Sequence, residues 1–137
     1  MGRPKADEIA RCDEVLELLG LVHLAEQPIE RLSLGQCRLV EVGRALITEP
    51  KLLLLDEPSS GLDRTESAQL AQTLREVQAE QGFSILLVEH DVELVSSFTT
   101  RAYVLDFGRV ITEGPTQEVL ASDEVRAAYL GDLEASA

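Results

Sequence analysis

The apolar positions in the first part of the chain follow a helical period. Between residues 7 and 22, apolar side chains recur in steps of three and four, which is the spacing of one helix face. These positions are Ile9, Cys12, Leu16 and Leu19. Ser33 and Gln36 then have the spacing of a capping box. That spacing predicts a second helix, which begins at Ser33 and ends before Pro50.

Two short, strongly apolar runs interrupt the helical pattern, of which the first is wholly apolar. The first consists of the four leucines of residues 52–55, and the second extends from residue 83 to residue 88. Runs of this kind are typical of strands that are buried on both faces. Between them, Asp63 and Glu66 form another capping-box pair, which predicts a helix that ends at Gly82.

The last third of the chain alternates between short elements. The pattern predicts a short helix from Asp91 through Phe98, a hairpin of residues 101–105 and 109–112 around Asp106-Phe107-Gly108, and two short helices after Pro115 and after Ser122. Strands that alternate with helices indicate an α/β fold with a largely parallel sheet.

Composition narrows the class of protein. The 137 residues are 45% hydrophobic and 27% charged, which is typical of a soluble globular protein. No apolar run approaches the ~20 residues of a membrane span, so we expect a cytoplasmic protein. The formal net charge of −13 disfavours nucleic acid as a partner, because phosphates require clustered Lys and Arg. Cys12 and Cys37 have no metal or redox spacing and are expected to be buried thiols.

Two carboxylates directly follow the first apolar run. A strand that ends in Asp56 and Glu57 places them at the carboxyl edge of a parallel sheet, where α/β folds bind ligands. In a phosphoryl-transfer site, the first acid would hold Mg²⁺ and the second would orient and deprotonate the attacking water. The alternative is an ordinary strand followed by a charged turn.

Three further segments contain candidate binding groups. The helix start at Leu32-Ser33-Leu34-Gly35-Gln36 could bind an anion through backbone N–H groups and a hydroxyl, or it could be a plain N-cap. The segment 59–63 is a tight turn after the carboxylates. His90 ends the second apolar run, which is predicted to lie beside the first, and its imidazole could hydrogen-bond a phosphate or the attacking water. A structural histidine is the alternative.

In this order and spacing, the four segments resemble the second half of an ABC-type nucleotide-binding domain, a P-loop NTPase. The resemblance extends over essentially the whole chain. It implies that residues 1–48 are part of the helical subdomain with the signature helix, and that residues 49–137 are the C-terminal part of the RecA-like ATPase core.

The resemblance implies a role for each candidate residue. Asp56 would be the Walker B ligand of Mg²⁺, Glu57 the catalytic base, and His90 the switch histidine. Asp63 would be the D-loop acid that communicates across a dimer of nucleotide-binding subunits. Ser33, Gly35 and Gln36 would belong to the signature motif, with Ser33 and Gly35 contacting the γ-phosphate of ATP held by the partner subunit. Leu34 departs from the small residue that is commoner at the centre of this motif.

The tail of the chain resembles one subfamily. The segments Val88-Glu89-His90-Asp91, Tyr103-Val104-Leu105-Asp106-Phe107-Gly108 and Ala128-Tyr129-Leu130-Gly131 look like the ATPase subunits of branched-chain amino acid importers. Such subunits imply three partners: a second nucleotide-binding subunit in a homo- or heterodimer, integral membrane permease subunits and, indirectly, a solute-binding protein. They are peripheral proteins on the cytoplasmic face of the cell membrane, and related polar solutes are alternative cargo.

One element of the family is missing from these residues. A phosphate-cradling Walker A loop has the form G-x-x-x-x-G-K-[ST]. The only lysines are Lys5 and Lys51, and each follows a proline. We therefore expect ATP and Mg²⁺ to bind only when a Walker A loop is supplied, and the isolated chain to be inactive. A fragment of a non-transport ABC ATPase and a non-catalytic interaction module with a signature face remain alternatives.

The missing loop has a structural consequence in the family's fold. The phosphate-loop strand of that fold lies between the strand that ends at His90 and the strand of residues 101–105. Without it, the 52–56 and 83–88 strands should still pair with each other. The 83–88 and 101–105 strands should each be left with an unpaired edge. They could pair directly, a strand from another copy could fill the gap, or the region could become disordered, and we expect pairing with another chain or a larger assembly.

Overall fold

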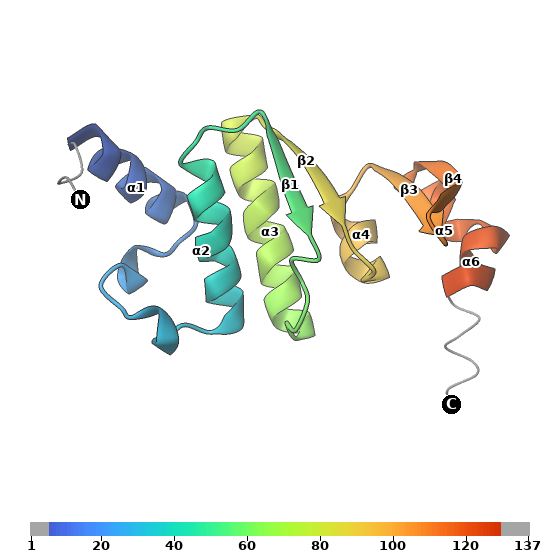
Figure 1. Cartoon of the computed structure of the whole chain (residues 1–137), viewed down its shortest axis with the longest axis horizontal. Coiled ribbons are helices and arrows are strands. Elements are labelled where there is room, and N and C mark those ends of the chain that lie inside the picture. Colours follow the sequence, from blue (N-terminus) through green and yellow to red (C-terminus); the bar gives the residue numbers. More distant parts are fainter. Residues whose placement is uncertain (1–5, 130–137) are drawn as a thin grey trace. The chain divides into compact units, whose positions relative to one another are not determined.

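The computed structural model describes residues 6–129, as two compact units, Met1–Glu89 and His90–Ala137 (Figure 1). The first unit contains α1 (Ala6–Leu18), η1 (Val22–Leu24), η2 (Ile29–Arg31), α2 (Leu34–Leu46), β1 (Leu52–Asp56), α3 (Arg64–Gln81) and β2 (Ser84–Val88). The second contains α4 (Val92–Phe98), β3 (Arg101–Asp106), β4 (Arg109–Pro115), α5 (Thr116–Ala121) and α6 (Asp123–Tyr129). The predicted elements are therefore present, and the subdomain division at residues 48/49 stays a prediction.

The first helix is confirmed, and of its four apolar positions Leu19 is buried and Leu16 half-buried, but the other two are exposed. Val15 and Leu19 are buried, whereas Ile9 is 49% exposed and Cys12 is also exposed. The predicted burial of Cys12 is therefore wrong, and Cys37 is only half-buried. The reason is the position of α2. Its Gly43 lies against Leu19 and Val15, so the side of α1 that packs is the side that carries these two residues.

Both predicted capping boxes are present. In α2 the Ser33 side chain accepts from the Gln36 backbone, and in α3 the Asp63 side chain accepts from the Glu66 backbone. In each helix the side chain of the third residue, Gln36 or Glu66, accepts a hydrogen bond from the backbone N–H of the cap residue. Gly82 then ends α3 in the left-handed region at φ 73°, a conformation in which glycine avoids a Cβ penalty.

The two apolar runs form a parallel pair, as predicted. Leu52 of β1 is opposite Ser84 of β2, and the register continues to Asp56 opposite Val88. Residues of one face are buried or half-buried: Leu53, Leu55, Ile85 and Leu87. The opposite face exposes more than half of each of four apolar side chains: Leu52, Leu54, Leu86 and Val88. The expectation of burial on both faces is thus met on one face only.

The second unit is built on an antiparallel hairpin. β3 and β4 meet at Phe107 and Gly108, which both have positive φ, and the register shifts between Val104 and Leu105. Val104 packs with Val119 of α5 and Val125 of α6 in a small core. The Thr99 and Thr116 hydroxyls are 2.8 Å apart, which links the end of α4 to the start of α5.

The strands of the described residues form two separate pairs, β1–β2 and β3–β4, instead of one largely parallel sheet. This agrees with the absence of a phosphate-loop strand from the sequence. Within residues 6–129, β2 pairs with β1 alone, so direct closure of β2 onto β3 is not found. Pairing of the β2 edge with another chain stays a prediction. No helix in this range has both the length and the apolarity needed to cross a bilayer.

The close packing of α1 on α2 depends on Gly43. A Cβ at this position would lie 2.9 Å from Leu19 Cδ1 and 3.3 Å from Val15 Cγ1. We expect Gly43→Val to lower the free energy of unfolding by about 1–3 kcal/mol more than Arg44→Val, because overpacking forces neighbouring side chains out of place. Arg44 is exposed on the same helix and controls for the helix propensity of valine. Urea unfolding followed by circular dichroism measures both. Equal losses would show that the contact is not tight.

Candidate functional site

The carboxylate pair lies at the carboxyl end of β1. Asp56 is the last residue of the strand, and the Glu57 N–H donates to the Val88 carbonyl at 2.8 Å, which extends the ladder by one residue. Both side chains are exposed. Glu57 has φ 44°, a left-handed conformation that is unusual for a residue with a side chain and costs roughly 1–3 kcal/mol. Such conformations persist where the surrounding structure holds them, and they cluster at functional sites.

The loop after Glu57 is a series of tight turns. The Ser60 N–H donates to the Glu57 carbonyl at 3.0 Å, and the Leu62 N–H donates to the Ser59 carbonyl at 2.9 Å. Gly61 has φ 80°, and a Cβ there would lie 2.9 Å from Leu34 Cδ2. The loop therefore contacts the start of α2 at a point where only glycine fits. This contact gives Leu34 a structural partner.

The start of α2 presents hydrogen-bonding groups that are already ordered. Ser33 Oγ accepts from the Gln36 N–H at 3.2 Å, and Gln36 Oε1 accepts from the Ser33 N–H at 2.9 Å. Because the serine oxygen acts as an acceptor, its hydroxyl hydrogen can be donated to an anion. The helix N-terminus adds a favourable dipole for negative charge. Ser33 is exposed, so a ligand can reach it.

Gly35 brings the starts of α2 and α3 together. A Cβ at Gly35 would lie 3.4 Å from Glu66 Oε1, and Glu66 belongs to the capping box of α3. A cavity of about 130 Å³ lies between the two helices. It is lined by Ser33, Gly35, Gln36, Leu39, Glu66, Gln69 and Leu70. The three signature candidates Ser33, Gly35 and Gln36 thus share one cavity, together with Glu66, for which the sequence indicated only a capping role.

Asp63 belongs to the first unit and His90 to the second. The Asp63 carboxylate accepts from the Glu66 N–H at 2.8 Å, so it caps α3. His90 is the first residue of the second unit, where its side chain is exposed and Asp91 caps α4 through the Leu94 N–H. The expectation that His90 shares a sheet edge with Asp56 stays a prediction.

Within the first unit, the candidate groups lie on one side. The carboxyl ends of β1 and β2 and the amino ends of α2 and α3 point the same way (Figure 1). Strand carboxyl ends and helix amino ends are the usual ligand-binding side of an α/β fold. The sequence-predicted residues of this unit are therefore gathered on that side.

The donor set fits a magnesium ion that is carried by a nucleotide. The described residues contain no group of three or more His, Cys, Asp and Glu side chains that could hold a metal ion alone. Mg²⁺ in nucleotide sites needs only one or two carboxylates, because phosphates and water complete its shell. Asp56 and Glu57 supply carboxylate oxygens of the required kind.

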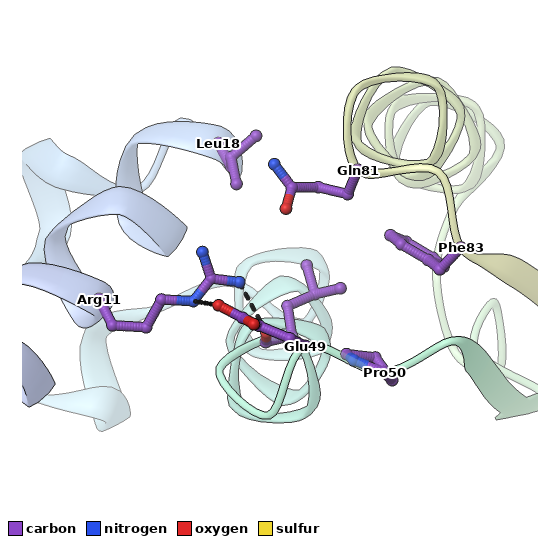
Figure 2. A pocket seen from close by; sticks show the side chains of 7 residues that line it. Arg11, Leu18, Glu49, Pro50, Gln81 and Phe83 are labelled. Atoms are coloured by element: carbon purple, nitrogen blue, oxygen red, sulfur yellow. Dashed lines mark hydrogen bonds and ion pairs between the residues drawn. The ribbon is translucent and has the colours of Figure 1, made fainter.

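A larger cavity, of about 310 Å³, lies away from these groups. Pro50, which precedes β1, and Phe83, which precedes β2, line it, so it lies at the amino ends of the strands. Figure 2 shows Arg11 pointing toward Glu49 in this cavity. The Arg11 guanidinium donates to the Leu46 carbonyl at 3.1 Å and lies 3.7 Å from the Glu49 carboxylate. The same carbonyl also accepts from the Glu49 N–H at 3.0 Å, so Arg11 adds a second hydrogen bond at the end of α2, which is a structural role.

Sequence reasoning missed Glu89. Its carboxylate accepts from the Ser59 N–H at 2.9 Å and so connects the end of β2 to the loop after the carboxylate pair. The signal was present in the sequence, because Glu89 is an acid beside His90 at the end of an apolar strand. Its partner became evident only from the register, in which Asp56 is opposite Val88.

Comparisons with protein families agree with this arrangement at both ends of the chain. A family model described as ABC transporter matches residues 5–60. A second model, described as branched-chain amino acid ATP-binding cassette transporter, matches residues 109–135. The second match includes Leu130-Gly131 of the importer-like tail, which lie outside the described residues.

Individual relatives are importer proteins. The phosphonates import ATP-binding protein PhnC 2 of Nostoc sp. is 42% identical over 120 residues, which are 88% of this chain and 49% of that protein. The high-affinity branched-chain amino acid transport ATP-binding protein LivG of Salmonella typhimurium is 33% identical over 130 residues, or 95% of this chain and 51% of that protein. The chain thus spans about half the length of these relatives.

Solved structures show the same fold. The ADP conformation of MJ1267, an ATP-binding cassette of an ABC transporter, matches with a TM-score of 0.86 and 32% identity over 94% of this chain and 52% of that one. The cbiO1 protein from Clostridium perfringens, part of the transporter complex cbiONQ, matches with a TM-score of 0.81 and 34% identity, over 97% of this chain and 54% of that one. The fold is that of an ATP-binding cassette.

The capping role of Asp63 can be separated from any role toward a ligand. Asp63→Ala should lower the free energy of unfolding by about 1 kcal/mol, because α3 loses its N-cap, whereas Asp63→Asn should keep the cap and stay within a few tenths of the parent value. Urea unfolding of the three chains measures this. If Asn destabilises as much as Ala, the carboxylate charge and not the cap is what matters.

Proposed function

Because this chain is homologous, over about half of their length, to the ATP-binding subunits of ABC transporters, we propose that it supplies the catalytic-carboxylate and signature part of an ATPase that powers import. The observation that carries the proposal is the position of Asp56 and Glu57. They end a parallel strand on the side of the unit to which the capped starts of α2 and α3 also point.

The active form, on this proposal, contains a G-x-x-x-x-G-K-[ST] segment in addition to residues 1–137; we call that form the assembled ATPase. The exposed apolar face of β1–β2 supports the need for a further layer. Leu52, Leu54, Leu86 and Val88 would be covered in the assembled ATPase, because parallel strands are normally covered on both faces.

Each candidate residue has one task in this ATPase. Asp56 would hold Mg²⁺ that arrives with ATP, and the chemistry supplied there would be neutralisation of negative charge on the phosphates. Glu57 orients the attacking water and accepts its proton, and its exposed carboxylate is accessible for that step. His90 hydrogen-bonds the terminal phosphate or the attacking water.

The signature residues act on a second nucleotide. Ser33 donates its hydroxyl, and Gly35 offers a backbone without a side chain, to the terminal phosphate of ATP that a second subunit presents. Gln36 holds Ser33 in place through the capping box. Asp63, which caps α3, fixes the end of the loop that would face the second subunit.

An ATPase that powers import requires partner proteins. They are a second nucleotide-binding subunit, permease subunits in the membrane and, through them, a solute-binding protein, with the chain on the cytoplasmic face. Branched-chain amino acids are the proposed cargo, supported by the match over residues 109–135. Phosphonates and methionine are alternatives, because relatives that resemble this chain are import proteins named for those solutes.

Two other functions would use the same residues differently. A non-transport ABC ATPase would hydrolyse ATP without permease subunits. A non-catalytic interaction module would bind a partner's nucleotide through Ser33 and Gly35 and would not need Glu57. The effect of Glu57 on turnover separates the module from both ATPases, and co-purification with permease subunits separates the two ATPases.

In the assembled ATPase, Glu57→Gln should keep MgATP binding and lower kcat by about 10²–10⁴-fold, because the water loses its base. Asp56→Asn should instead weaken binding and its Mg²⁺ dependence. Steady-state hydrolysis and calorimetric titration separate the two effects. Glu80→Gln on the exposed end of α3 is the matched control and should leave both unchanged. Near-normal kcat in Glu57→Gln would remove Glu57 from the base role.

The 137-residue chain by itself should show no measurable hydrolysis of ATP and at most very weak nucleotide binding. The reason is that a phosphate loop and its lysine provide most contacts to the phosphates, and no such segment occurs in the sequence. Isothermal calorimetry with MgATP measures this. An affinity in the micromolar range would mean that this chain holds nucleotide through groups other than those named here.

A further inference from the structure

We propose that Glu89 is a positioning residue for hydrolysis, which fixes the loop of residues 57–62 and thereby the direction of the Glu57 carboxylate. The inference rests on the proposed function, in which Glu57 is the base. Glu89 itself does not touch the reacting atoms on this account. It acts through the hydrogen bond that its carboxylate accepts from the Ser59 N–H at 2.9 Å.

The bond connects residues that are 30 positions apart, within the first unit. Ser59 is only 8% exposed, so its N–H has little access to water. A buried N–H that loses its partner carries the full penalty of desolvation. Because the acceptor is a carboxylate, the bond is of the charge-assisted kind, which is about twice as strong as a neutral one. Removal of the Glu89 side chain would therefore release this point of the loop.

Glu57 lies between two attachments to the end of β2. On one side of it, the Glu57 N–H donates to the Val88 carbonyl at 2.8 Å, and on the other side the Ser59 N–H donates to Glu89. Pro58 separates the two donors and has no N–H of its own. Val88 and Glu89, which are consecutive at the end of β2, thus hold the chain on both sides of the Glu57 side chain.

This double attachment explains how Glu57 keeps φ 44°. A non-glycine residue in the left-handed region relaxes to a commoner conformation unless its neighbours hold it. A change of φ at Glu57 would redirect its side chain, because the side chain moves with the backbone at that position. On the C-terminal flank the Ser60 N–H bond to the Glu57 carbonyl lies within the loop, and the Glu89 bond is the one that attaches the loop to β2, so its loss should affect the step in which Glu57 acts.

The effect of Glu89 should therefore appear in turnover and not in nucleotide affinity. In the assembled ATPase, Glu89→Ala should lower kcat by about 10–100-fold, the range expected when a charged partner of a hydrogen bond is lost. Its KM for ATP should change by less than about twofold, because Glu89 makes no contact that contributes to binding ATP in the ground state. Glu89→Gln keeps an oxygen that can accept from the Ser59 N–H, and it should retain kcat to within about threefold.

Amide hydrogen exchange gives a readout that does not depend on activity. In the 137-residue chain, Glu89→Ala should speed exchange of the Ser59 amide by about tenfold or more relative to the parent, whereas Glu89→Gln should restore most of the protection. Glu80→Ala, on the exposed end of α3, is the matched loss of a carboxylate and should leave kcat and Ser59 exchange unchanged.

The outcomes separate this inference from the proposed function. Parent-like kcat in Glu89→Ala, a loss that appears in KM instead of kcat, or failure of Gln to restore turnover would each overturn the role of Glu89. If the assembled ATPase hydrolyses ATP normally with Glu57→Gln, the proposed function fails instead. Should Glu89→Ala not fold, the Glu89→Gln variant decides, because unprotected exchange at Ser59 in that variant contradicts the bond.

Discussion

The parallel pairing of β1 with β2 is the constraint on which the candidate site depends. The ladder places Asp56 opposite Val88 and continues through the Glu57 N–H to the Val88 carbonyl. Because both strands end at the same level, the carboxylates and Glu89 meet at one edge. A shift of one residue in this register would turn Asp56 to the opposite face and would remove the acceptor of the Glu57 N–H.

The same edge is connected to α2 through the loop that follows Glu57. Leu34 contacts this loop at Gly61, and Gly35 lies against Glu66 at the start of α3. The two capping boxes hold the helix starts, so the contacts are made between ordered elements. The strand end, the loop that follows it and the starts of α2 and α3 are therefore connected by contacts on one side of the unit.

The sequence predicted the elements because their signals are local. Capping boxes at Ser33 and Asp63, the apolar runs and the turn at Gly108 depend on residues a few positions apart, and the structure contains all of them. The expected burial of Cys12 was wrong because burial along α1 depends on where α2 lies, which a periodic pattern does not encode. The Glu89–Ser59 bond was missed because it requires the strand register and the loop path together. The exposed face of β1–β2 differed from expectation because no described element packs on it, and an apolar run does not encode which elements lie beside it.

On the proposed function, this chain supplies the hydrolytic carboxylates of a nucleotide site whose phosphate loop belongs to another segment. A chimera tests it most directly, with the N-terminal half of the Nostoc phosphonate import protein placed before residue 1 of this chain. The measurement is the rate of ATP hydrolysis by the chimera, compared with this chain and with that half alone. The account predicts Mg²⁺-dependent hydrolysis in the chimera and none in either part. A folded chimera that binds MgATP without hydrolysing it would contradict the account.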